Sequence, residues 1–288
     1  MVRTFRSYAD LTKYKLSAAV TLSAVTGYFL SGNKVEVSFF LVAAGVFFLS
    51  SGSAAMNQYT ESVTDSIMKR TSKRPIPSKM ISGKNALFAS ILLYAAGSIL
   101  IMCTGLAPFL LGALNVILYN VVYTRLKKIT PLSIVPGALV GAIPPLIGFT
   151  ASEATSLNTG IIGFSLFMFL WQLPHFWLII IKYREEYNAA GFATIAKYMN
   201  DKQIRNLIFF WVLFSTCLIF MFFIISDIPG KALPALFLFL NVTFILLFHR
   251  LLFASKYEGQ VKGAFILINS FSLLIMILFI AASLLKYI

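Results

Sequence analysis

Charged residues are scarce in this sequence, since only 12% of its 288 residues are Asp, Glu, Lys or Arg while 59% are hydrophobic. The mean hydropathy is correspondingly high, at +0.85. A water-soluble globule of this size does not need so much apolar material. The composition therefore excludes an ordinary soluble domain and indicates a protein whose solvent is the lipid bilayer.

Cysteine is also scarce, and both cysteines, Cys103 and Cys217, lie inside apolar runs. Neither stands at the spacing from other cysteines or histidines that a zinc site needs, so the sequence predicts neither a disulfide framework nor structural zinc. No low-complexity linker or polar domain interrupts the apolar pattern. We therefore expect a single polytopic domain over residues 1–288.

Long hydrophobic runs are what the sequence has in abundance. A helix that crosses the hydrocarbon core needs about 20 apolar residues. About nine runs approach that length; they lie near residues 16–32, 35–55, 85–104, 106–123, 133–151, 157–181, 206–226, 232–253 and 264–285. The first run follows Lys13 and Lys15 as a signal peptide would, but because eight more runs come after it we interpret it as a retained helix. The sequence predicts an all-α membrane protein with about nine transmembrane helices.

Basic residues are distributed unevenly between alternate loops. Of the 24 lysines and arginines, only Lys34, Lys231 and Lys286 fall in one set of loops, and the other 21 fall in the N-terminus and the remaining set. By the positive-inside rule the richer set is cytoplasmic, which gives a cytoplasmic N-terminus and, with an odd number of spans, an external C-terminus. We expect a multi-pass protein of the bacterial cell membrane. Orientation and attraction to anionic lipid account for the net charge of +14, so no nucleic-acid partner is expected.

The stretch "NQYTESVTDSIMKRTSKRPIP", residues 57–77, follows the second apolar run and sets Asn57, Glu61 and Asp65 four residues apart. On a helix a step of four residues advances roughly 400°, so the three side chains drift by only about 40° per step and share one face. Mg²⁺ takes such oxygen ligands and completes its shell with water and substrate phosphates. The spacing is consistent with a Mg²⁺–diphosphate site.

Four cations follow these ligands at once: Lys69, Arg70, Lys73 and Arg74. Of these, Arg70, Lys73 and Arg74 could contact phosphate oxygens and stabilise the charge of a leaving diphosphate. The alternative is a cytoplasmic loop whose carboxylates only offset its cations, with Asn57 as a helix cap. The position of the polar residues near the end of a span favours the functional interpretation, because uncompensated polar groups are costly there.

Two further segments reach the same membrane face. The sixth run ends in Glu185 and Glu186, which could hold a second metal or the far side of the same diphosphate, or simply form a solvated helix end. The segment "YNVVYTRLKKITP" offers Tyr119, Tyr123 and Lys127, together with Arg125 and Lys128, although orientation alone would also explain its cations.

His175 stands between Pro174 and Phe176, well inside an apolar run. An ionisable residue at such a depth is a functional hypothesis by default. The alternative is that the imidazole only hydrogen-bonds a carbonyl group that Pro174 leaves without its helical partner.

Four segments together carry a family resemblance. They are "LTKYKLS", "NQYTESVTDSIMKRTSKRPIP", "YTRLKKITPLSIVPGALVGAIPPLIGFTA" and "LWQLPHFWLIIIKYREEYNAAGF", spread over residues 11 to 192. The chain resembles the UbiA-type intramembrane prenyltransferases, whose first motif is Asn-x-x-x-Asp-x-x-x-Asp at the end of the second span. The arginine–proline run and "PHFW" favour the haem-farnesylating branch of that superfamily. Two features depart from the family pattern: Glu61 replaces the usual Asp, and Glu185 and Glu186 are adjacent where the family has two spaced aspartates.

The resemblance implies a helical bundle around a central cavity with loops on the cytoplasmic side. It implies farnesyl diphosphate as donor, haem b as acceptor and Mg²⁺ as cofactor, with haem O as product. The metal ligands it implies are Asn57, Glu61, Asp65 and Glu186. The catalytic groups are Asn57, Glu61, Asp65, Arg70, Lys73 and Arg74, and the substrate contacts are His175, Tyr123, Lys127, Glu185, Glu186 and Lys13.

Two alternative functions stay open at this point. A related prenyltransferase that acts on an aromatic or quinone-precursor acceptor would share the first motif. An ion-coupled transporter would also use polar residues in the membrane, but it would place acids in mid-span or show an inverted repeat, and neither is evident in the sequence. The sequence leaves the oligomeric state open.

Overall fold

The computed structural model describes residues 2–32, 34–154, 156–225, 232–253 and 257–285, and within these ranges every regular element is a helix. Three of the basic residues counted in the charge asymmetry, Lys231, Lys256 and Lys286, lie outside the described residues. The all-helical class predicted from the apolar runs is confirmed.

Most helices follow one another with short connections, and the longest loop between described helices is residues 68–82, between α4 and α5. In chain order they are α1 Val2–Leu11, α2 Tyr14–Leu30, α3 Val37–Thr60, α4 Ser62–Ile67, α5 Gly83–Met102, α6 Leu106–Ile117, the π-helical η1 Leu118–Tyr123, α7 Thr124–Leu126, η2 Pro131–Ser133, α8 Ile134–Thr150, α9 Thr159–Lys182, α10 Arg184–Ala189, η3 Ile195–Lys197, α11 Asp201–Ile225, α12 Ala232–Phe253 and α13 Tyr257–Leu285.

Eight helical segments of 20 to 26 residues are long and apolar enough to cross a membrane, among the residues that the structure describes. They correspond to the second to ninth predicted spans. The first predicted span forms α2, which has 17 residues. At 1.5 Å per residue it is about 26 Å long, a little less than a typical hydrocarbon core. The protein is a multi-pass integral membrane protein, and α2 is the predicted span whose helix falls a little short of that core.

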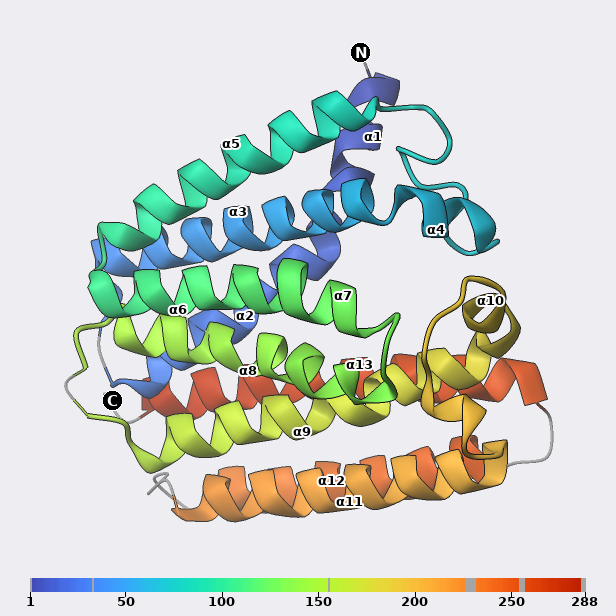
Figure 1. Ribbon diagram of the computed structural model, residues 1–288. Helices are drawn as coiled ribbons and strands as arrows, with labels where there is room; N and C mark the ends of the chain where they lie inside the picture. The colour runs from blue at the N-terminus through green and yellow to red at the C-terminus, as the bar shows by residue number, and fades with distance from the viewer. Residues whose placement is uncertain (1, 33, 155, 226–231, 254–256, 286–288) are drawn as a thin grey trace.

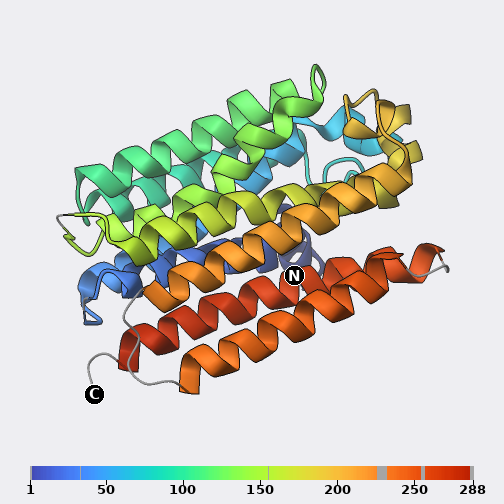
Figure 2. The ribbon, with the colours of Figure 1, turned by 90° about the horizontal axis from the view of Figure 1, so that it is seen from below.

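The long helices run side by side along one direction (Figures 1 and 2). Helix α3 packs on α5, α2 packs on α8, and α9 lies between α8 and α11, while α13 contacts α2, α9 and α12. The short elements α4 and α10 lie together at one end of the bundle, where α2 begins (Figure 1). This end carries the acidic and basic motifs.

Aromatic packing fills the half of the bundle around α9. Trp171 is 3% exposed and lies 5.6 Å from the ring of Phe244 and 5.5 Å from that of Phe271, measured between ring centroids. Outward-facing residues are apolar as well: Phe239 and Leu246 of α12 are each 66% exposed. Apolar side chains on both faces of a helix are expected where the surrounding solvent is lipid.

Small residues let α2 and α8 approach closely, as in other membrane helix pairs. A Cβ atom added at Gly148 would lie 1.7 Å from the carbonyl oxygen of Ala24, and one added at Gly27 would lie 1.9 Å from that of Pro145. Both obstacles are backbone atoms, which cannot rotate away. The contact therefore requires glycine at both positions.

We expect Gly148→Ala to destabilise the bundle by at least about 2 kcal/mol, because α2 must move away from α8. Gly83→Ala is the matched control, since a Cβ there would lie 3.4 Å from the Tyr59 ring, which is ordinary contact. Thermal unfolding of the detergent-solubilised protein measures both. Equal melting temperatures for the two variants would contradict the close approach.

Candidate active site

Asn57, Glu61 and Asp65, the three predicted oxygen ligands, are called the ladder below. They lie in one row although the helix that carries them is interrupted. Helix α3 ends at Thr60, and Glu61, with φ −104° and ψ 8°, separates it from α4. The hydrogen bonds from Glu61 N to Asn57 O, 3.0 Å, and from Asp65 N to Glu61 O, 2.8 Å, nevertheless keep the four-residue spacing. The three residues are 3%, 4% and 1% exposed. Together they form a buried column of oxygen ligands.

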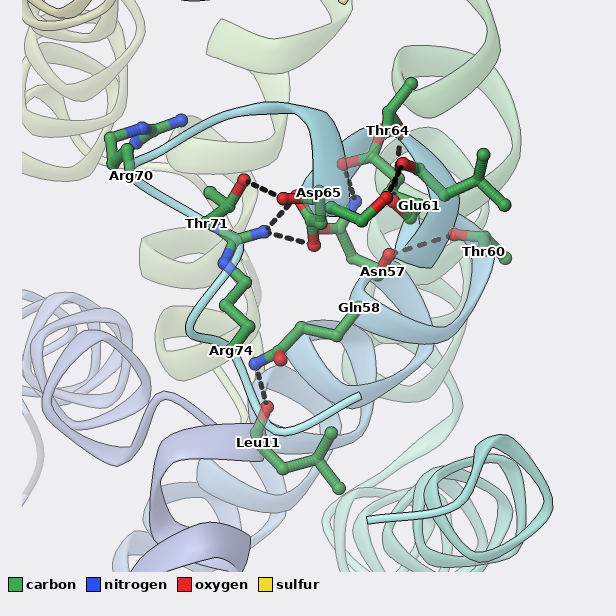
Figure 3. Close-up of polar contacts among 12 residues, drawn as sticks. Leu11, Asn57, Gln58, Thr60, Glu61, Thr64, Asp65, Arg70, Thr71 and Arg74 are labelled. Carbon is green, nitrogen blue, oxygen red and sulfur yellow. Dashed lines mark hydrogen bonds and ion pairs between the residues drawn. The ribbon is translucent and has the colours of Figure 1, made fainter. Parts of the chain in front are cut away.

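Each carboxylate of this ladder has a cationic partner, which is Arg74 for Asp65 (Figure 3) and Lys127 for Glu61. Arg74 Nη1 donates to both Asp65 oxygens at 2.7 Å. Lys127 Nζ forms an ion pair with Glu61 Oε1, and Asn57 Nδ2 donates to Glu61 Oε2 at 3.0 Å. Because buried charges are costly unless they are paired, these contacts allow two acids to lie together at the site. The sequence had suggested Arg74 as a phosphate contact, and here its guanidinium lies on Asp65.

The loop after α4 is tied to α10. The backbone N–H of Arg70 donates to Glu186 Oε2 at 2.9 Å, and Arg70 Nη2 donates to the Tyr187 hydroxyl at 3.2 Å. The guanidinium also lies over the ring of Tyr183, 5.0 Å from its centroid. Glu186, which the resemblance implied as a metal ligand, therefore holds the loop backbone and does not line the cavity that contains Asn57, Glu61 and Asp65. These contacts join segments more than 110 residues apart.

Two further predicted site residues lie apart from the others. Lys73 and Glu185 are both exposed, and neither lines the cavity that contains the ladder. A basic run or an acidic pair reaches a given membrane face as a unit, but its individual side chains point in different directions. Sequence spacing alone did not distinguish them from their neighbours Arg74 and Glu186.

The segment from Tyr119 to Lys127 forms one wall of the site. It begins in the π-helical η1, a feature often found at functional sites. The rings of Tyr119 and Tyr123 stack with centroids 5.8 Å apart, and Lys127 Nζ lies 5.2 Å from the Tyr123 centroid. Burial lowers the pKa of Lys127, and the attraction of Glu61 acts in the opposite sense.

Lys13 brings a further cation to the site from the junction of α1 and α2. Its backbone is left-handed, with φ 47° and ψ 48°. Burial, followed by the charges of Arg74 and Lys127, lowers the pKa of Lys13 to about 7. An anion bound among these three cations would favour the protonated form and offset their mutual repulsion.

Gln58 is a residue that the sequence reasoning missed. Its side chain is 1% exposed, and Nε2 donates to the carbonyl oxygens of Asp10, 3.0 Å, and Leu11, 2.9 Å (Figure 3). These bonds fix the end of α1 beside α3 and so position Lys13. A polar residue directly after Asn57 at the end of an apolar run was the available signal.

The ladder opens into a cavity of about 450 Å³ that is lined by α2, α3, η1, α8 and α9. Its deep end is formed by apolar residues of α3, α6 and α8. On α9, Gln172, His175 and Phe176 line the wall. The His175 ring lies 4.9 Å from that of Phe265, between centroids, and hydrogen-bonds the side chain of Asn269.

The ladder suits a hard cation that is shared with a substrate. Among the described residues no group of three or more His, Cys, Asp or Glu side chains is arranged to hold a metal by itself. Two carboxylates and an amide oxygen leave coordination positions for water and phosphate oxygens, which is the usual environment of Mg²⁺ in proteins. The donor set therefore fits Mg²⁺ accompanied by a phosphorylated ligand.

A helical bundle with two buried carboxylates and facing cations at one end of its cavity defines a polytopic membrane protein with a charged internal site. The chain belongs to the UbiA prenyltransferase family, which it matches over residues 20–271. The resemblance inferred from the four motifs is confirmed, and the transporter alternative is wrong.

Relatives and solved structures agree with this assignment. The chain is 34% identical over 269 residues to the protoheme IX farnesyltransferase of Listeria monocytogenes serotype 4a, covering 91% of this chain and 87% of the relative. It is 32% identical over 279 residues to that of Cytophaga hutchinsonii, covering 93% of each.

Two solved structures share the fold. A UbiA homolog from Aeropyrum pernix K1 superimposes with a TM-score of 0.77 at 17% identity, covering 96% of this chain and 99% of that one. A homolog from Archaeoglobus fulgidus bound to GPP and Mg²⁺ gives 0.74 at 15% identity, covering 96% and 98%.

Proposed function

We propose that the protein transfers the farnesyl group of farnesyl diphosphate to a vinyl group of haem b, giving haem O. The observation that carries the proposal is the buried Asn57–Glu61–Asp65 ladder, faced by cations inside a cavity that also contains His175. The relatives at 32% and 34% identity are named for protoheme IX farnesyl transfer, which favours haem over an aromatic or quinone-precursor acceptor.

The donor would bind with its diphosphate at the ladder. Mg²⁺ held by Asn57, Glu61 and Asp65 would supply the positive charge that lets a diphosphate approach two carboxylates. Lys13, Arg70, Arg74 and Lys127 would surround the diphosphate and stabilise the charge that it gains on leaving. Lys127 and Arg74 already lie against the ladder, so small rotations would bring them onto phosphate oxygens.

The transfer itself needs a water-poor environment. The carbon–oxygen bond of the donor breaks, diphosphate leaves with the electron pair, and the allylic carbon becomes cationic. The nearby Tyr119 and Tyr123 rings can stabilise such a cation through their faces. A haem vinyl group then forms the new carbon–carbon bond, and a water molecule adds to the resulting cation and loses a proton. Exclusion of bulk water up to this point limits simple hydrolysis of the donor.

The acceptor would lie against α9. His175 can ligate haem iron, hydrogen-bond the porphyrin edge or transfer a proton when water adds. Phe176, which lines the cavity beside it, offers apolar surface to a macrocycle. We also propose that the end carrying α4 and α10 faces the cytoplasm of a bacterial cell, because the basic residues gather in its loops.

Release of diphosphate tests the proposal with purified protein. We expect Mg²⁺-dependent release from farnesyl diphosphate that haem b stimulates and an aromatic carboxylic acid does not. Stimulation by the aromatic acid with no response to haem b would overturn the acceptor assignment and leave the prenyltransferase class intact.

Arg74 and Lys79 lie in the same basic run and provide a matched pair of substitutions. We expect Arg74→Gln to weaken Mg²⁺-dependent binding of farnesyl diphosphate by at least about 10-fold, which corresponds to about 1.4 kcal/mol, because a buried charge-assisted contact is lost. Lys79→Gln should bind normally, since Lys79 is exposed and outside the cavity. Equal affinities of the two variants for farnesyl diphosphate would show that the basic run only sets the orientation of the protein in the membrane.

A further inference from the structure

The deep end of the cavity differs in character from its mouth. Val46 and Leu49 of α3 and Ile147 of α8 line it and are 3%, 8% and 2% exposed. Gly112 of α6 completes this surface. One to two helical turns nearer the ladder, the lining residues are polar, namely Ser53 and Asn115. The lining therefore changes from charged to polar to apolar with depth, which matches a ligand with an anionic head and an apolar tail.

The same face of α3 carries both ends of this gradient. Asn57, Ser53, Ser50, Leu49 and Val46 all line the cavity and follow one another at helical steps of one, three or four residues. From Asn57 to Val46 the helix rises about 16 Å. A tail attached to a diphosphate at the ladder would run along this face and meet Leu49 and Val46 at its end. That distance suits three extended isoprene units.

Helix α6 packs closely against Leu49 at Gly112. A Cβ atom there would lie 3.0 Å from Leu49 Cδ1 and 3.7 Å from Ile101 Cδ1. Glycine inside a helix costs about 1 kcal/mol relative to alanine, and φ at Gly112 does not require it. A side chain larger than a methyl group would extend into the cavity floor and shorten the space below the ladder.

We propose that Gly112 and Leu49 form the end stop that sets the length of the prenyl donor. The inference rests on the proposed function and adds specificity-determining residues to it. Gly112 keeps the floor low enough for the third isoprene unit, and Leu49 closes the floor against a fourth. Neither residue contacts the diphosphate, so both act on the choice of donor while the ladder binds the head.

Competition between donors tests the end stop. Purified protein receives equal concentrations of geranyl, farnesyl and geranylgeranyl diphosphate with Mg²⁺ and haem b, and the prenylated haems are separated by mass. We expect the wild type to prefer the C15 donor. Gly112→Val should shift the ratio of C10 to C15 product by at least 10-fold toward C10, and Leu49→Ala should raise the share of C20 product by a similar factor. Gly112→Ala should give a smaller shift in the same direction as Gly112→Val.

Leu114→Val is the matched control, because Leu114 lies on the same helix, is 45% exposed and is absent from the cavity lining. Its donor ratio should equal that of the wild type.

A second readout, displacement of bound farnesyl diphosphate by the other two donors without haem, separates the end stop from the acceptor assignment. If wild type prenylates no haem but the variants shift these displacement ratios, the proposed function fails and the end stop stands. If all variants fold and keep the wild-type ratios, the end stop is wrong.

Discussion

Glu61→Gln and Asp65→Asn should each reduce farnesyl transfer by at least about 100-fold while the protein remains inserted and folded. Each substitution removes a charge that we propose to ligate Mg²⁺ and changes almost no volume. The cationic partners Lys127 and Arg74 stay in place, so the loss comes from the ligand and not from the basic residues. Mg²⁺-dependent donor binding should fall together with turnover, which links the effect to the metal.

Two controls sharpen this prediction. Glu61→Asp should retain substantial activity, because a shorter carboxylate at the same helical position is what the family usually has. Glu36→Gln, which removes an exposed carboxylate just before α3 at the opposite end of that helix, should behave as wild type. Wild-type rates for the Gln and Asn variants would show that the ladder does not bind the metal.

His175→Ala should separate the two halves of the reaction. We expect haem binding and prenyl-haem formation to fall by at least about 10-fold, the equivalent of one lost hydrogen bond or iron ligand. Mg²⁺-dependent binding of farnesyl diphosphate should stay near wild type, because His175 is seven residues, about two helical turns, from Lys182 at the end of α9.

His249→Ala is the matched control, since His249 also lies at the ring of a phenylalanine, 5.2 Å from Phe209 between centroids, but is exposed and outside the cavity. It should leave both halves intact. If both halves also survive in His175→Ala, His175 has a structural role in holding Asn269. If donor binding fails instead, the two substrates occupy the cavity in the reverse arrangement.

Sequence predicted the parts of this protein that depend on local pattern. The apolar runs gave the spans, because a bilayer requires a minimum length of apolar helix. The four-residue steps from Asn57 to Asp65 gave the ladder, because backbone hydrogen bonds preserve that spacing even where Glu61 separates two helices. The first predicted span, residues 16–32, has the length of α2 but lies two residues later in the chain, since hydropathy does not mark where Ser31 ends the helix.

Tertiary contacts were beyond sequence reasoning. That Lys127 pairs with Glu61, and Glu186 with the backbone of Arg70, depends on how α3, α7 and α10 meet in space. The placement of Lys13 depends on Gln58, which bonds the chain 47 residues earlier at Leu11. Adjacent residues such as Glu185 and Glu186 are equivalent in a sequence pattern. Only the fold shows that Glu186 accepts the hydrogen bond from the backbone of Arg70.

The mass of the product tests the central claim most directly. Purified protein is incubated with farnesyl diphosphate, Mg²⁺ and haem b in water enriched in ¹⁸O, and the haem fraction is analysed by mass spectrometry beside the Asp65→Asn variant. The account predicts a haem that carries one farnesyl group and one ¹⁸O-labelled hydroxyl group, formed by the wild type and nearly absent with the variant. Unmodified haem together with labelled farnesol, or equal product from both proteins, would contradict it.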